Sequence, residues 1–134
     1  MNPPYFKQNS VKESHILSSH QARVESMPLS AWISVAKNRC KQNGKITVIQ
    51  RVERLPDIIK CLDGYFGQVT VQPISSFKDT SPKTVIVQAT KTSGAAFKLL
   101  APKIVHRRDG ISGKVVYEDE FKKILRYGHP LQLN

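Results

Sequence analysis

Residues 45–50 read Lys45-Ile46-Thr47-Val48-Ile49-Gln50, a β-branched run that predicts a buried strand. Before this run, Pro28 begins a predicted helix, because a proline at the first helical position loses no hydrogen bond. Gly44 is expected to end that helix. Apolar residues repeat along it at i, i+3, i+4 and i+7, and they are Leu29, Trp32, Ile33 and Ala36. An amphipathic helix therefore leads directly into the strand.

After the strand, a second helix is predicted to begin near Pro56. Helical spacing is carried by Leu55, Ile58, Ile59, Leu62 and Phe66, with Gly64 and Gly67 at the frayed end. Residues 69–74 and 84–89 are expected to form an antiparallel hairpin whose long tip is the polar loop 75–82. This order of elements suits the second half of a doubly wound α/β sheet, which binds ligands at the carboxyl ends of its strands.

The two ends of the chain are less regular. Residues 7–27 are expected to be a flexible loop with room for a short helical piece, and residues 98–105 one more extended segment. Glu118, Asp119 and Glu120 open a short helix through Arg126, with acids first and bases last, as the helix dipole favours. We interpret the chain as one partial domain with three parts, which are residues 1–27, the helix and strand core 28–97, and the C-terminal extension 98–134.

The charge of the chain indicates its class of partner. Among 134 residues, 21 lysines and arginines outweigh 10 acidic residues, for a net charge of +11. This imbalance favours a polyanion, RNA or DNA before anionic lipid. No apolar run approaches the ~20 residues of a membrane span, and the N-terminus lacks the apolar core of a signal peptide. The histidines and cysteines do not have the spacing of a zinc site, so we predict no metal site. We also predict a cytoplasmic protein without a membrane partner.

Asn2-Pro3-Pro4-Tyr5 lies directly after the first methionine and is suited to hold a flat amine. A ring amino group such as adenine N6 is a poor nucleophile, because its lone pair is delocalised. The Asn2 amide oxygen and the Pro3 carbonyl can accept its two N–H groups and aim the lone pair at an incoming methyl group. The prolines fix the direction of the carbonyls, Tyr5 offers a face on which a base can stack, and Phe6 can line the same pocket. The alternative is a turn signal in a frayed N-terminus.

These residues and several later ones resemble the bacterial tRNA adenine-N6 methyltransferases that modify valine tRNA, within the class I S-adenosylmethionine-dependent methyltransferases. The likeness spans nearly the whole chain, in residues 2–6, 22–25, 29–32, 43–49, 51–55, 101–106 and 124–128. The resemblance implies that Asn2, Pro3, Pro4 and Tyr5 are the catalytic residues. It also implies a Rossmann-like sheet of order 3-2-1-4-5-7-6, of which this chain would hold strands 5 to 7 with flanking helices.

The cofactor implied by the resemblance is S-adenosylmethionine, which this family binds through a glycine-rich turn after its first strand. No two glycines here lie closer than Gly64 and Gly67, which fall at a predicted helix end instead. We therefore expect no complete cofactor site, with Asn2 only at its edge, and no cofactor binding by the chain alone. The chain is expected to be the C-terminal half of an enzyme, from a split, frameshifted or mis-started gene. A separately encoded N-terminal half is then a candidate partner. Without that half, strand 45–50 would leave an apolar edge open to aggregation, and the fragment would be inactive and either marginally folded or insoluble.

Beyond Phe6, the candidate substrate-binding residues are basic and lie near the expected pocket or beyond the end of a predicted strand. They are Lys7, Lys12, Arg23, Arg51, Arg54, His106, Arg107 and Arg108. The cluster Lys122, Lys123 and Arg126 is interpreted instead as a solvated face.

The expected function is N6-methylation of adenine in RNA, with tRNA as the substrate. The alternatives are a non-catalytic basic RNA-binding module derived from a methyltransferase, and the product of a decayed or split gene. DNA and protein glutamine stay open as targets, because a side-chain amide presents the same delocalised nitrogen. The net charge favours nucleic acid.

Overall fold

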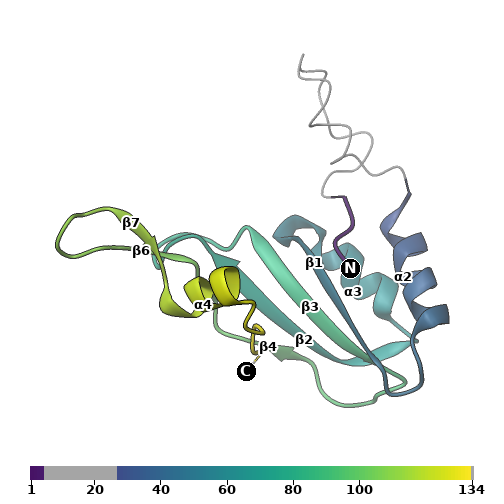
Figure 1. The fold of residues 1–134 in the computed structure, drawn as a ribbon. Coiled ribbons are helices and arrows are strands. Elements are labelled where there is room, and N and C mark those ends of the chain that lie inside the picture. The colour runs from purple at the N-terminus through teal and green to yellow at the C-terminus, as the bar shows by residue number, and fades with distance from the viewer. Residues whose placement is uncertain (5–26, 134) are drawn as a thin grey trace.

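The computed structural model describes residues 1–4 and 27–133, and Figure 1 shows their arrangement. In chain order, the elements are α2 (Leu29–Arg39), β1 (Lys45–Arg51), the 3-10 turn η2 (Val52–Arg54), α3 (Leu55–Leu62), β2 (Phe66–Ser75), β3 (Thr84–Lys91), β4 (Lys98–Leu99), β5 (Lys103–Ile104), β6 (His106–Arg108), β7 (Val115–Tyr117) and α4 (Asp119–Tyr127). The predicted order of helix, strand, helix and hairpin between residues 28 and 91 is confirmed.

The main sheet has the order β1-β3-β2-β4, and β5 also pairs with β2. β3 runs antiparallel to both of its neighbours, with Val87 opposite Val48 on one side and Val71 on the other. β4 and β5 run parallel to β2. The order β1-β3-β2 is the 5-7-6 arrangement expected at the end of a class I methyltransferase sheet. The predicted fold class, a Rossmann-like fragment, is therefore confirmed.

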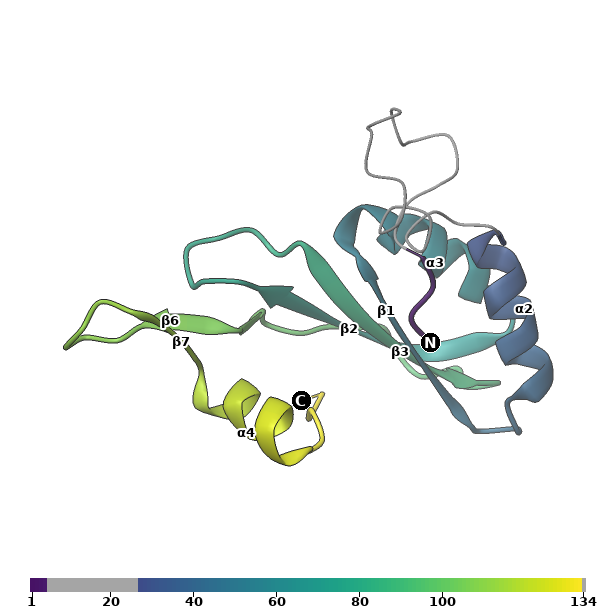
Figure 2. The same ribbon diagram turned by 45° about the horizontal axis from the view of Figure 1, so that its top comes forward.

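Two helices cover one face of the sheet. α2 and α3 lie together on this face, whereas α4 lies on the opposite side, near β6 and β7 (Figure 2). In β1, buried and more exposed residues alternate, because successive side chains point to opposite faces. The core between the sheet and the two helices consists of Leu29, Ile33, Ile46, Val48, Ile58, Leu62, Phe66, Val71, Val85, Val87 and Ala89.

α2 ends earlier than predicted. Its last residue is Arg39, and Gly44 lies in the turn into β1, where its N–H donates to the Lys41 carbonyl oxygen (2.9 Å). Asn43 adopts the left-handed conformation in this turn (φ 58°). A Cβ at Gly44 would lie 2.7 Å from Cys40 Sγ. The glycine thus marks a tight turn and not the helix end.

A lysine fastens the end of α2 to β3. Lys91 Nζ donates to the carbonyl oxygens of Lys37 (2.7 Å) and Cys40 (2.8 Å). These carbonyls have no partner within the helix, and a cation at this point also lies at the negative end of the helix dipole. The Lys91 side chain therefore fixes the helix against the sheet.

α3 also ends before its predicted boundary. It stops at Leu62, Gly64 reverses the chain with φ 75°, and Phe66 and Gly67 open β2. The prediction that Phe66 extends the helical stripe is wrong, although its side chain is buried in the same core. A Cβ at Gly67 would lie 1.8 Å from the Ser93 carbonyl oxygen, so close backbone approach explains this glycine.

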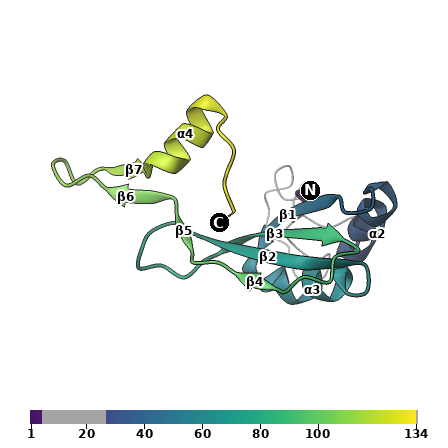
Figure 3. The same ribbon diagram turned by 90° about the horizontal axis from the view of Figure 1, so that it is seen from below.

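The C-terminal part differs most from expectation. Residues 98–105 run along β2 as an extended segment was expected to do, but Leu100-Ala101-Pro102 interrupts the pairing and divides the segment into β4 and β5. The β6–β7 hairpin was not predicted; it extends beyond the sheet next to α4 (Figure 3). The predicted helix at Glu118–Arg126 is confirmed as α4, and Gly128 (φ 68°) ends it.

Candidate functional site

Met1 runs beside the outer edge of β1. The Ile49 N–H donates to the Met1 carbonyl oxygen (3.0 Å), and the Met1 amino group donates to the Thr47 carbonyl oxygen (2.5 Å). A residue bonded on either side of Val48 has the pattern of a parallel pair. Asn2, Pro3 and Pro4 therefore continue toward the carboxyl end of β1, the side on which doubly wound sheets bind ligands. Part of the edge that was expected to be open is covered here.

A buried glutamine holds the two prolines. Gln50 Nε2 donates to the carbonyl oxygens of Pro3 (3.3 Å) and Pro4 (3.0 Å), and Gln50 Oε1 accepts the Arg51 N–H (2.9 Å). Because the oxygen is committed to an N–H donor, the orientation of the amide is determined by its partners. Gln50 is completely buried. It therefore fixes the direction of both proline carbonyls.

The two proposed acceptors differ in their surroundings. Asn2 is exposed, whereas Pro3 is almost completely buried. A carbonyl oxygen has two lone pairs, so the bond from Gln50 leaves one of them on Pro3 for a further donor. Asn2 is thus open to an approaching amine, whereas the Pro3 carbonyl is fixed in buried surroundings.

Gln50 was not predicted as a site residue. The pattern placed it in a strand, and its polarity did not affect that interpretation. The signal in the sequence was an amide on the same strand face as Ile46 and Val48, because a buried amide requires hydrogen-bond partners.

Two predicted phosphate-binding arginines lie at the end of β1. Arg51 Nη2 lies 3.2 Å from Glu53 Oε1, and the hydrogen bond from Arg51 lowers the pKa of Glu53. Arg54 is only 7% exposed, and its Nε lies 3.0 Å from Asp57 Oδ2. Burial in an ion pair argues against the predicted phosphate contact at Arg54. Arg51 is partly exposed and stays a candidate.

The predicted residues His106, Arg107 and Arg108 form β6, beyond the carboxyl end of β2. The His106 N–H donates to the Ser76 carbonyl oxygen (2.9 Å) and so ties β6 to the end of β2. Arg107 and Arg108 are exposed. Figure 1 shows the N-terminal motif and this hairpin well apart, so the structure does not bring the two groups together.

The remaining predicted site residues, Tyr5, Phe6, Lys7, Lys12 and Arg23, lie outside the described residues, as does nearly all of the predicted loop 7–27. Within residues 1–4 and 27–133, no three His, Cys, Asp or Glu side chains gather as a metal site requires. In the same ranges, the helices are all too short or too polar to cross a membrane.

These residues do not fit S-adenosylmethionine. A cofactor site of the class I fold needs glycines where a strand turns into a helix, so that the backbone can approach the ligand. β1 turns into α3 through Arg51-Val52-Glu53-Arg54, which contains no glycine. The described residues therefore supply no glycine-rich turn for such a cofactor.

The fold is similar to that of one solved protein. The structure matches the crystal structure of a predicted O-methyltransferase from Agrobacterium tumefaciens with a TM-score of 0.64 and 22% sequence identity. The match covers 71% of this chain and 44% of that chain, so this chain spans less than half of the matched protein. At this identity, the similarity shows the fold alone. Neither a protein-family model nor a curated protein matches the sequence.

Proposed function

We propose that this chain is the substrate-binding part of an S-adenosylmethionine-dependent methyltransferase that acts on adenine N6 in RNA, with tRNA as its substrate. The observation that carries the proposal is the position of Asn2-Pro3-Pro4 at the carboxyl end of β1, with both proline carbonyls bonded to Gln50. The methyltransferase-like fold and the net charge of +11 support it. The methyl donor would be bound by a part of the enzyme outside these 134 residues.

In this proposal, the residues act by holding the amine. The Asn2 amide oxygen and the Pro3 carbonyl oxygen accept the two N–H groups of the target, and these bonds strengthen as positive charge develops on the nitrogen. Gln50 keeps the Pro3 carbonyl in one direction, so that little reorganisation is needed when the base arrives. The contribution of these residues is geometry and dipoles, without a general base.

The test is reconstitution. The DNA upstream of the Met1 codon is read for a frame that encodes a glycine-rich βαβ unit, and that unit is expressed with this chain, as one polypeptide or as two. Incubation with a tRNA transcript and S-adenosylmethionine is expected to yield N6-methyladenosine, detected by mass spectrometry of the nucleosides. Asn2→Ala is expected to lower the rate by about 100-fold, the scale for one lost polar contact to a transition state.

The matched control is Asn38→Ala, an exposed asparagine on α2, which is expected to leave the rate unchanged. A complex that methylates protein glutamine and no nucleoside would contradict the proposal. So would full N6-adenine methylation by the Asn2→Ala variant.

A further inference from the structure

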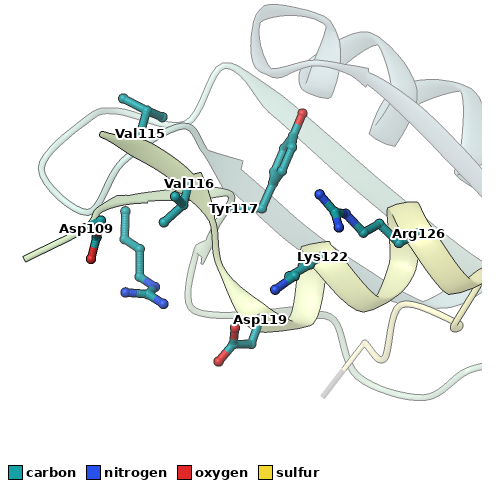
Figure 4. A pocket seen from close by; sticks show the side chains of 8 residues that line it. Asp109, Val115, Val116, Tyr117, Asp119, Lys122 and Arg126 are labelled. Atoms are coloured by element: carbon teal, nitrogen blue, oxygen red, sulfur yellow. The ribbon is translucent and has the colours of Figure 1, made fainter. Parts of the chain in front are cut away.

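The β6–β7 hairpin and α4 line a second candidate site. A cavity of about 410 Å³ lies between them, and its polar lining consists of Arg107, Asp109, Tyr117, Asp119, Lys122 and Arg126 (Figure 4). This volume falls within the range of about 300–1,000 Å³ that is usual for small-molecule sites. Of this lining, only Arg107 was among the predicted site residues.

Two cations of this cavity have no acidic partner within the described part of the chain. Lys122 and Arg126 lie one turn apart on α4, and both extend from the helix toward the β7 side of the cavity (Figure 4). The nearby Glu120 is occupied, because both of its carboxylate oxygens accept hydrogen bonds from Lys103 Nζ (2.7 and 3.0 Å). Like charges at i and i+4 repel, so a bound anion would relieve this repulsion.

The two carboxylates of the lining do not neutralise these cations. Asp109 is committed to the hairpin turn, where it accepts hydrogen bonds from the Ser112 hydroxyl (2.6 Å) and from the N–H groups of Ile111 (3.4 Å) and Ser112 (3.2 Å). Asp119 lies in the first turn of α4, and among the described residues it forms no ion pair with Lys122 or Arg126. Glu118 does not line the cavity, and its Oε2 lies 3.7 Å from Arg107 Nε. An anion can therefore approach Lys122 and Arg126.

An aromatic stack stands beside these cations. The Tyr117 ring lies 4.8 Å from the His106 ring, and the His106 ring lies 5.6 Å from that of Phe77, between ring centroids. Tyr117 is 45% exposed. Tyr117 lines the cavity, and one side of its ring packs against His106. Cations beside an exposed aromatic face are the features that single-stranded nucleic acids require.

We infer that this cavity binds one nucleotide of single-stranded RNA, with its phosphate between Lys122 and Arg126 and its base on Tyr117. The inference rests on the proposed function only in taking RNA as the substrate. The cavity lies well apart from Asn2-Pro3-Pro4 (Figure 1), so the nucleotide it holds is not the one that is methylated. The site would fix where along the RNA the target adenine lies.

The experiment measures the affinity of the chain for RNA, without cofactor. A fluorescein-labelled single-stranded RNA is titrated with the protein at several salt concentrations, and binding is followed by fluorescence anisotropy. Lys122→Ala with Arg126→Ala is expected to weaken binding about tenfold and to reduce the slope of log affinity against log salt by about 0.7 for each lost phosphate contact. Tyr117→Ala is expected to weaken binding about tenfold with an unchanged slope, whereas Tyr117→Phe retains the affinity.

The matched control is Lys41→Ala with Lys60→Ala, which removes the same charge from exposed positions away from the cavity. Equal loss of affinity in the control and the cavity variant would overturn the inference, and so would an unaltered affinity in Tyr117→Ala. Competition by polyglutamate as strong as competition by RNA would assign the cavity to acidic peptides instead. Because no methyl transfer is measured, these outcomes are independent of the reconstitution experiment.

Discussion

Gln50 is the residue on which the geometry of the N-terminal motif depends. Its side chain is completely buried and bonds to two carbonyls and one N–H. We expect Gln50→Leu to lower the free energy of unfolding by about 1–3 kcal/mol, because polar groups lose their partners without gaining solvent. Urea unfolding followed by far-UV circular dichroism measures this change.

The control for this substitution is Gln88→Leu on the neighbouring strand, where the amide donates only a 3.3 Å hydrogen bond to Thr47 Oγ1 and is partly solvated. It is expected to change the stability by at most about 0.5 kcal/mol. If the two variants lose equal stability, the bonds to Pro3 and Pro4 do not hold the motif.

We expect Asp109 to make the β6–β7 hairpin sensitive to acid, because its carboxylate accepts hydrogen bonds within the hairpin turn. Hydrogen bonds from the Ser112 side chain, and then from the N–H groups of Ile111 and Ser112, lower the pKa of Asp109 below its ordinary value. A lowered pKa in the folded state means that the stabilisation is complete above the pKa of the unfolded chain. It is lost as the pH falls through the pKa of the folded state. We expect the amide resonances of Ile111 and Ser112 to titrate with the Asp109 carboxyl group in NMR spectra. In Asp109→Asn, this pH dependence is expected to vanish; its persistence would assign the titration to another group.

At the scale of single elements, Gly67 decides how β2 begins. Its missing side chain allows the Ser93 carbonyl oxygen to approach, and the register of β2 against β3 shifts between Gly67 and Thr70. We expect Gly67→Ala to cost about 1–3 kcal/mol of stability, as overpacking does, measured by thermal unfolding. Gly94→Ala lies in the same region with nothing within 4 Å of the added carbon, and it is expected to be near neutral. Equal melting temperatures for the two variants would contradict this account.

The elements that were predicted correctly are those with strong local periodicity. α2, β1 and the β2–β3 hairpin follow from apolar spacing and β-branched runs. Phe66 was misassigned because it lies four residues after Leu62, a spacing that fits a helix. Gly64 lies between them in the left-handed conformation, and it ends the helical path of the chain. The β6–β7 strands carry basic and half-exposed side chains and so show no apolar period.

The candidate site was likewise predicted only in part from the sequence. Asn2, Pro3 and Pro4 are informative in the sequence because proline restricts the backbone wherever it occurs. The role of Gln50 and the burial of Arg54 depend on side chains that meet only in three dimensions. The cavity beside α4 depends on a helix and a hairpin that were not known to be neighbours.

For the whole molecule, the decisive property is which part of a methyltransferase fold these residues provide. The described sheet corresponds to the 5-7-6 end and contains no glycine-rich turn from a strand into a helix. We therefore expect isothermal titration of the chain with S-adenosylmethionine to give no binding heat. Micromolar affinity for the chain alone would contradict this expectation. The chain together with its glycine-rich βαβ unit is the positive control.

The tie between Lys91 and the end of α2 has a consequence for chemical labelling. An ammonium group that donates to two carbonyl oxygens must leave them before its nitrogen can react with an acylating reagent. Modification of Lys91 then reports detachment of the helix from the sheet, while exposed amines such as Lys60 react at the rate of free lysine. The ratio of the acylation rates of Lys91 and Lys60 therefore measures how often α2 detaches from the sheet, and the measurement requires no engineered probe.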